Sequence, residues 1–146
     1  MNQLPRSEQR LIWAQQALND SAFQLESASS DASFRSYWRG QSDGTTWIVM
    51  DAPPDKEDTA PWLAMTKRLT DAGLNAPLIK AVDSENGFVM MSDLGTRLLL
   101  PELNTDTVDA LYLQAMSALL QMQTKLQSKD LPTYDWIHQF PGYKQT

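Results

Sequence analysis

The sequence predicts an α+β fold in which helices pack against an antiparallel sheet. Short strand-like segments are joined by turn residues, as in hairpins, and apolar residues recur at helical spacing in three other stretches. The predicted order along the chain is helix, hairpin, strand, helix, hairpin, sharp break and long helix. With 146 residues, of which 42% are hydrophobic, the chain is long enough to build a real core.

Three helices are predicted from caps, helix breakers and apolar spacing. Ser7 is a suitable N-cap for the first, which ends at an Asn-Asp pair. The second has Pro61 in its first turn and Gly73 just past its end. The third runs from an N-cap at Asp106 to Gln127 and is apolar on two faces. We therefore expect it to have packing neighbours on two sides.

Five strand segments are predicted from alternation or from short apolar runs bounded by turns. They are residues 22–26, 34–39, 45–50, 76–82 and 87–91. A turn of small residues joins the first two, and Asp43 with Gly44 forms a tight turn before the third. A Glu-Asn-Gly turn at 85–87 precedes the last, so these segments favour antiparallel hairpins.

Composition excludes several classes of function. The formal net charge is −6 and no Lys/Arg cluster occurs, which argues against a nucleic acid or an anionic membrane as the main partner. The absence of Cys excludes disulfides and thiolate metal sites, and His138 is the only histidine. No apolar run is long enough to span a bilayer and the N-terminus lacks a signal-like region, so we expect a cytoplasmic protein.

Residues 27–54 contain the most informative pattern. The turn between the first two predicted strands holds Ser, Asp and Ala, which leaves backbone N–H groups available to an anion. Arg35 follows closely enough to fold back over such an anion. An ordinary exposed hairpin, with Arg35 in a surface ion pair, fits the same residues, and both interpretations remain open. Neither the P-loop nor the dinucleotide-binding glycine pattern is present.

Four segments together resemble the amino-terminal part of the aminoglycoside-phosphotransferase-like (protein-kinase-like) sugar kinases. Within that family they are most similar to the bacterial N-acetylmuramate/N-acetylglucosamine 1-kinases of cell-wall recycling. The segments are SSDASFRSYWR at 29–39, WIVMDAPPDKED at 47–58, AGLNAPLIKAVDSENGFVMMSDLGTR at 72–97, and LPTYD followed by FP at 131–141. The resemblance covers nearly the whole chain in order.

The resemblance implies a small lobe that binds ATP between its sheet and a larger helical lobe. Residues 1–95 would form the small lobe with an N-terminal helix, and residues 96–146 would begin the large lobe. The implied nucleotide-binding residues lie in a covering loop, a pocket-lining strand, the region of the small lobe's helix carboxylate, and a hinge that meets adenine. In that order they are Ser30, Asp31, Ala32, Ser33, Phe34 and Arg35; Ile48 and Met50; Glu57; and Met91, Ser92, Asp93 and Leu94.

Two features depart from the kinase pattern. A Lys is expected near the end of the third strand to hold the nucleotide phosphates, but this strand ends Val-Met-Asp. Arg35 or Lys56 is a candidate replacement. The catalytic loop His-x-Asp-x-x-x-x-Asn and the following metal-binding Asp are also absent from the 146 residues. We therefore expect no catalytic or metal-binding residue here and no turnover by this chain alone, although the complete enzyme would use ATP and Mg²⁺.

A second interpretation is a non-catalytic nucleotide-binding or interaction module with the same small-lobe fold. It predicts ATP affinity and a stable monomer. A kinase portion without its large lobe would instead expose the second face of the 106–127 helix and tend to self-associate. The sequence leaves both interpretations open, with a nucleotide as a partner in each and an amino sugar only in the first.

Overall fold

A computed structural model describes residues 4–30 and 34–126 as an antiparallel sheet flanked by helices. The elements are α1 (Arg6–Leu18), β1 (Glu26–Ser30), β2 (Ser36–Ser42), β3 (Thr45–Asp51), α2 (Ala60–Asp71), β4 (Ile79–Asp83), β5 (Phe88–Ser92), α3 (Leu99–Glu102) and α4 (Val108–Lys125). The five strands lie in the order β1-β2-β3-β5-β4, and every neighbouring pair is antiparallel. The predicted α+β class and antiparallel sheet are confirmed.

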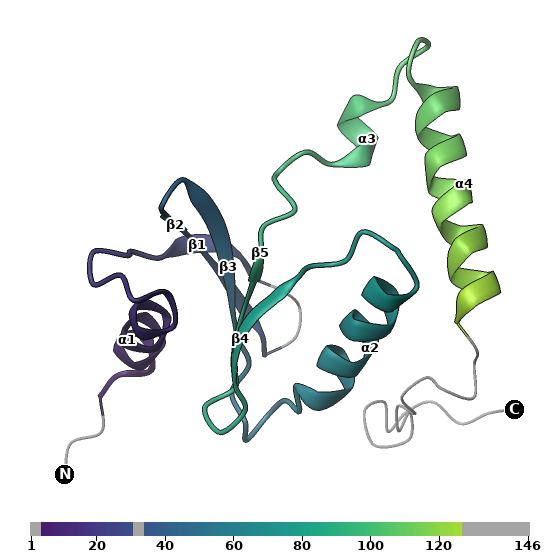
Figure 1. Cartoon of the computed structure of the whole chain (residues 1–146). Helices are drawn as coiled ribbons and strands as arrows, with labels where there is room; N and C mark the ends of the chain where they lie inside the picture. The colour runs from purple at the N-terminus through teal and green to yellow at the C-terminus, as the bar shows by residue number, and fades with distance from the viewer. Residues whose placement is uncertain (1–3, 31–33, 127–146) are drawn as a thin grey trace, which may run out of the picture.

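Successive residues of a strand point to opposite faces of the sheet. Both faces of this sheet are covered by packed side chains. On one face Val49 and Met90 pack with Ala14 of α1 and with Phe23. On the other face Met50, Val89 and Met91 pack against side chains of α2. Figure 1 shows α1 and α2 on opposite sides of the sheet, with α3 on the path that leads from β5 to α4.

The start of α1 differs from the prediction at Ser7. The helix begins at Arg6, and the residue in the N-cap position is Pro5, whose carbonyl accepts hydrogen bonds from the N–H groups of Glu8 and Gln9. Ser7 therefore lies inside the first turn and is not the N-cap. The predicted end is confirmed, because Asn19 adopts a left-handed conformation and terminates the helix.

The first hairpin is shifted along the chain relative to the prediction. Strand β1 starts at Glu26, so the predicted strand at 22–26 is wrong except for its last residue. The alternation of apolar and polar residues at 22–26 reflects packing and not a strand, because the segment before β1 is irregular and its Phe23 is buried beneath α1. Strand β2 likewise starts two residues later than predicted and ends at Ser42. The tight turn is confirmed, since Asp43 and Gly44 both have positive φ, as a two-residue hairpin turn requires.

Helix α2 closely matches its prediction, whereas α4 differs. Pro61 lies in the first turn of α2, and Gly73 follows its end with a φ of +77°. Helix α4 begins at Val108, after a turn in which the Asn104 side chain accepts hydrogen bonds from the N–H groups of Asp106 and Thr107. Asp106 is therefore not the N-cap. The predicted end at Gln127 lies outside the described residues.

Helix α4 has no buried residue. Its Gln121 Nε2 and Lys125 Nζ donate to the carbonyl of Ala72, at the end of α2, at 2.7 and 3.1 Å. The predicted main face is not buried: Leu119 is 49% exposed and Met116, on the second predicted face, is 61% exposed. Among the described residues, α4 therefore presents apolar side chains that no neighbour buries. Within the part of the chain that the structure describes, no helix combines the length and apolarity needed to cross a bilayer.

Candidate functional site

The sheet face toward α2 brings the predicted pocket-lining residues together. Ile48 pairs directly with Met91 across β3 and β5, and Met50 pairs with Val89. Directly opposed residues in an antiparallel sheet share a face, so these side chains form one apolar surface. Met50 is fully buried there. Two strands thus place Ile48, Met50 and the first predicted hinge residue, Met91, on one surface.

Arg35 and Glu57 meet across 22 residues of sequence. The Arg35 guanidinium lies 3.3 Å from Glu57 Oε2, and both side chains are largely buried. Glu57 lies in the connection between β3 and α2 and precedes the helix by three residues, so it is not a helix residue. Nearby, the Lys56 ammonium lies 6.0 Å from the centroid of the Phe34 ring. The last two residues of the predicted covering loop, Phe34 and Arg35, thereby contact the connection before α2.

The covering loop itself is only partly described. Ser30 is the last residue of β1 and pairs with Ser36 of β2. Asp31, Ala32 and Ser33 lie outside the described residues, as does His138. The anion-binding role of this turn therefore stays a prediction.

A phosphate-binding Lys is expected near the end of β3. That strand end instead carries an apolar residue on one face of the sheet and an acidic residue on the other. Met50 points into the core toward α2. Asp51 belongs to the opposite face, where its carboxylate accepts hydrogen bonds from Arg6 Nε at 2.8 Å and Arg10 Nη1 at 2.6 Å. Asp51 thus attaches α1 to the sheet and is not on the sheet face toward α2. Of the two proposed replacements, Arg35 is the cation that lies beside Glu57.

The predicted hinge begins with two side chains that stabilise the backbone. Ser92 Oγ accepts a hydrogen bond from the Leu78 N–H, and the Ser92 N–H donates to the Leu78 carbonyl. Asp93 Oδ1 accepts from the Gly95 N–H at 2.9 Å. The next residue, Leu94, is exposed, and within residues 4–30 and 34–126 its N–H has no backbone acceptor. Side-chain hydrogen bonds therefore fix the turn after β5, while the Leu94 N–H stays available as a hydrogen-bond donor.

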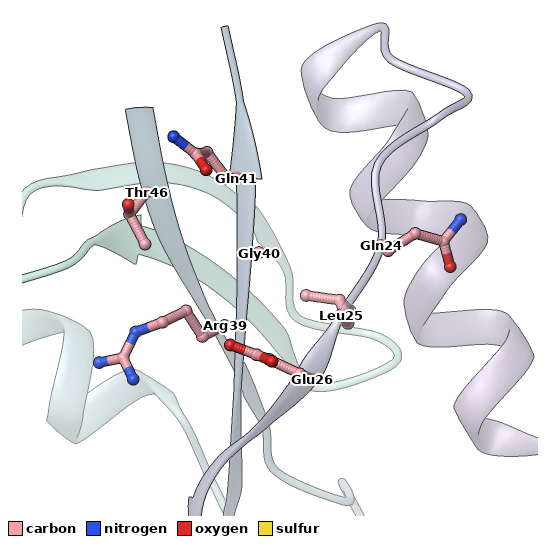
Figure 2. A pocket seen from close by; sticks show the side chains of 7 residues that line it. All are labelled: Gln24, Leu25, Glu26, Arg39, Gly40, Gln41 and Thr46. Atoms are coloured by element: carbon pink, nitrogen blue, oxygen red, sulfur yellow. The ribbon is translucent and has the colours of Figure 1, made fainter. Parts of the chain in front are cut away.

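Arg39 of β2 is a site residue that the sequence interpretation missed. Its Nε donates to Asp93 Oδ2 at 2.8 Å and its Nη2 to Asp93 Oδ1 at 3.3 Å. The residue also lines a hollow of about 320 Å³ with Gln24, Leu25, Glu26, Gly40, Gln41 and Thr46 (Figure 2). The pairing joins residues 54 positions apart. The one available signal was a charged residue at the end of an aromatic-rich predicted strand.

The Arg39–Asp93 pair has an electrostatic consequence. The hydrogen bond from Arg39 is the largest cause that lowers the pKa of Asp93 below its ordinary value of 3.8, and the Gly95 N–H lowers it further. The same hydrogen bond raises the pKa of Arg39. The charged pair is thus the favoured state at neutral pH.

A pH series on Asp93→Asn tests this pair. A carboxyl whose pKa is lower in the folded state stabilises the protein above its unfolded pKa and loses that contribution as the pH falls through the folded pKa. We expect the native chain to exceed Asp93→Asn in unfolding free energy at pH 6, and this difference to shrink steadily below pH ~4. Urea unfolding at several pH values measures it. A difference that stays constant down to pH ~3 would contradict the assignment.

The described residues offer no metal centre. Within residues 4–30 and 34–126, no group of three or more Asp, Glu or His side chains lies close enough to hold an ion. The acidic run before α2 is instead divided among separate contacts: Asp55 pairs with Lys56, Glu57 with Arg35, and Asp58 accepts from the Ala60 N–H.

Comparison with known proteins defines the class. Residues 24–142 match the group described as the phosphotransferase enzyme family, and the chain belongs to that family. The antiparallel sheet with its flanking helices is consistent with the small lobe of the kinase-like fold in this family. The family resemblance found in the sequence is thereby confirmed.

Three curated relatives share one name, N-acetylmuramate/N-acetylglucosamine kinase. The chain is 40% identical over 140 residues to the protein from Pseudomonas putida, an alignment that covers 89% of this chain and 41% of the relative. It is 43% identical over 112 residues to the Pseudomonas aeruginosa protein, covering 77% and 33%. It is 38% identical over 128 residues to the protein from Neisseria meningitidis serogroup B, covering 84% and 38%. The chain therefore spans well under half the length of these relatives.

Proposed function

We propose that this chain is the nucleotide-binding portion of an ATP-dependent amino-sugar kinase. The complete enzyme would transfer the γ-phosphoryl group of ATP to the anomeric hydroxyl of N-acetylmuramate or N-acetylglucosamine, in cytoplasmic recycling of the cell wall. The observation that carries the proposal is that three relatives with this kinase name match the region at 38 to 43% identity. The shared sheet face of Ile48, Met50 and Met91 supports it.

In this proposal each part of the face has a distinct role. Ile48 and Met91 supply an apolar surface for the base, and the backbone at Leu94 meets the edge of the adenine. Arg35 lies close to the covering loop and supplies the positive charge that phosphates require. Its pairing with Glu57 orients the guanidinium, much as a carboxylate orients the phosphate-binding Lys in kinases. Mg²⁺ would accompany ATP in the complete enzyme.

The division into two lobes is part of the same proposal. Residues 1–95 contain all five strands with α1 and α2, and residues 96–146 include α3 and α4. Helix α4 contacts the C-terminal end of α2 and leaves apolar side chains such as Leu113 and Leu120 exposed. Such a face suits a helix that belongs to a larger helical lobe. This exposure favours the kinase proposal over a self-sufficient, non-catalytic module.

Calorimetric titration of the 146-residue chain with Mg·ATP tests the proposal. We expect saturable binding to one site, because the face described above supplies contacts for both base and phosphate. We expect no phosphate transfer to N-acetylmuramate above a protein-free control, since the base and metal ligands of phosphoryl transfer are not among these residues. Absence of any binding heat by a folded chain at millimolar ATP would refute nucleotide binding. Transfer by this chain would refute the assigned division of roles.

A further inference from the structure

We propose that the Arg39 guanidinium is the surface on which the nucleobase stacks, and that Asp93 is the positioning residue that holds it there. This inference rests on the proposed nucleotide-binding function and adds a base-recognition residue to it. The juxtaposition that carries it is an arginine from β2 fixed by a carboxylate of the hinge segment, on the sheet face that also carries Ile48 and Met91.

The first step concerns where the guanidinium lies. Arg39 is paired directly with Ile48 of β3, and Ile48 is paired directly with Met91 of β5, so the three residues share one face of the sheet. To reach Asp93, which follows β5, the Arg39 side chain must cross β3. Figure 2 shows it extending past β3 on the side away from β1. The guanidinium therefore lies over the surface assigned to the base.

The second step concerns its orientation. Two donors of one guanidinium reach the two oxygens of one carboxylate, an arrangement that fixes the plane of the group as well as its position. The Asp93 carboxylate is itself held by the Gly95 N–H. The Arg39 side chain is 24% exposed and that of Asp93 is 11% exposed, so the guanidinium stays accessible while its partner is shielded. A planar, fixed and accessible cation is suited to stacking on an aromatic ring.

The third observation is the backbone beside the carboxylate partner. Leu94, one residue beyond Asp93, offers an available backbone edge. The hollow of about 320 Å³ that Arg39 lines lies on the β1 side of this arginine, with Gln24, Leu25 and Glu26 in its lining and neither Asp93 nor Leu94, so it is not the space assigned to the base. A base over Ile48 and Met91 would have the guanidinium as a stacking partner and the Leu94 backbone at its edge. These are the two kinds of contact by which proteins hold an unstacked base.

Three probes separate base contacts from phosphate contacts: ATP, adenosine, which lacks phosphates, and inorganic tripolyphosphate, which lacks a base. Each is titrated against the native 146-residue chain and the variants Arg39→Gln, Arg39→Lys and Asp93→Asn. The matched control is Arg97→Gln, because Arg97 makes the same two-donor pair with Glu102 at 3.2 and 2.6 Å in an exposed position after the hinge. Circular dichroism of each variant confirms the fold.

We expect Arg39→Gln and Arg39→Lys to weaken ATP and adenosine binding roughly tenfold, within the range of a cation–ring contact. Lysine keeps the charge but not the planar surface, so a charge effect alone would spare it. We expect Asp93→Asn to act in the same direction by a smaller factor, and Arg97→Gln to have no effect. Tripolyphosphate binding should be unchanged in all variants, a result that a general structural defect would not produce.

Two results would overturn the inference. If the Arg39 variants weaken tripolyphosphate binding as much as ATP binding, or leave the binding of ATP and adenosine unchanged, Arg39 does not hold the base. The proposed nucleotide-binding function survives in either case. If the native chain binds neither ATP nor adenosine, the proposed function and this inference both fail.

Discussion

Replacing Asp51 by Ala is expected to lower the free energy of unfolding by about 3–5 kcal/mol, the cost of leaving a buried charge without its partner. The Asp51 side chain is 5% exposed and that of Arg10 is 7% exposed, and their atoms lie 2.6 Å apart. Arg6 binds the second carboxylate oxygen. Removal of the carboxylate would leave the Arg10 guanidinium buried between α1 and the sheet with no anion beside it.

The aromatic contacts of the two arginines do not compensate for this loss. The Arg10 guanidinium lies 3.7 Å from the centroid of a Trp38 ring, and that of Arg6 lies 4.7 Å from the Phe88 ring. Such contacts contribute about 0.5–2 kcal/mol each and are already present in the native state. The net effect therefore stays large, and α1 is the element expected to detach first.

Chemical unfolding of Asp51→Ala and Asp51→Asn measures the effect. The Asn variant keeps one acceptor and loses the charge, so we expect an intermediate loss and a variant that folds. The matched control is Asp71→Ala, which breaks an exposed pair with Lys67 whose side chains are 61% and 75% exposed. It should change the unfolding free energy by less than about 1 kcal/mol. Equal effects of Asp51→Ala and Asp71→Ala would contradict the role assigned to Asp51.

Local signals in the sequence predicted much of the fold. The Asp43-Gly44 turn and Pro61 at the start of α2 were each found from residues whose backbone preferences are strong. Gly87 is another such position, since a Cβ there would collide with the Ala52 carbonyl and φ is +71°. Predictions failed where a local signal competed with packing. Ser7 suits an N-cap, yet the helix already begins at Arg6.

The parts of the site that the sequence could not reveal depend on long-range pairing. Asp51 meets Arg10 across 41 residues, and Arg39 meets Asp93 across 54. Which residues become neighbours depends on the strand order, in which β5 lies beside β3 although α2 and β4 separate them along the chain. The resemblance placed the expected nucleotide site at β3 and at the segment after β5, and this placement stays a prediction. It assigned Asp93 to the hinge but contained no signal that Arg39 would bind it.

Phosphorylation of an amino sugar by a chimeric kinase tests the central claim most directly. In the chimera, this chain replaces the matching 140-residue segment of the Pseudomonas putida kinase, with which it is 40% identical. The rest of the relative supplies the remainder of the enzyme, so the assay asks whether this chain performs the nucleotide-binding role in that reaction. A chimera carrying Arg97→Gln serves as a matched control for substitution at an exposed ion pair outside the proposed site.

We expect the folded chimera to transfer phosphate from Mg·ATP to N-acetylmuramate or N-acetylglucosamine, forming the anomeric sugar phosphate. The control chimera should match it, whereas one carrying Arg39→Gln should need roughly tenfold more ATP for the same rate. A folded chimera that binds ATP but phosphorylates neither sugar would favour the non-catalytic module. A folded chimera that neither binds ATP nor phosphorylates either sugar would contradict the central claim.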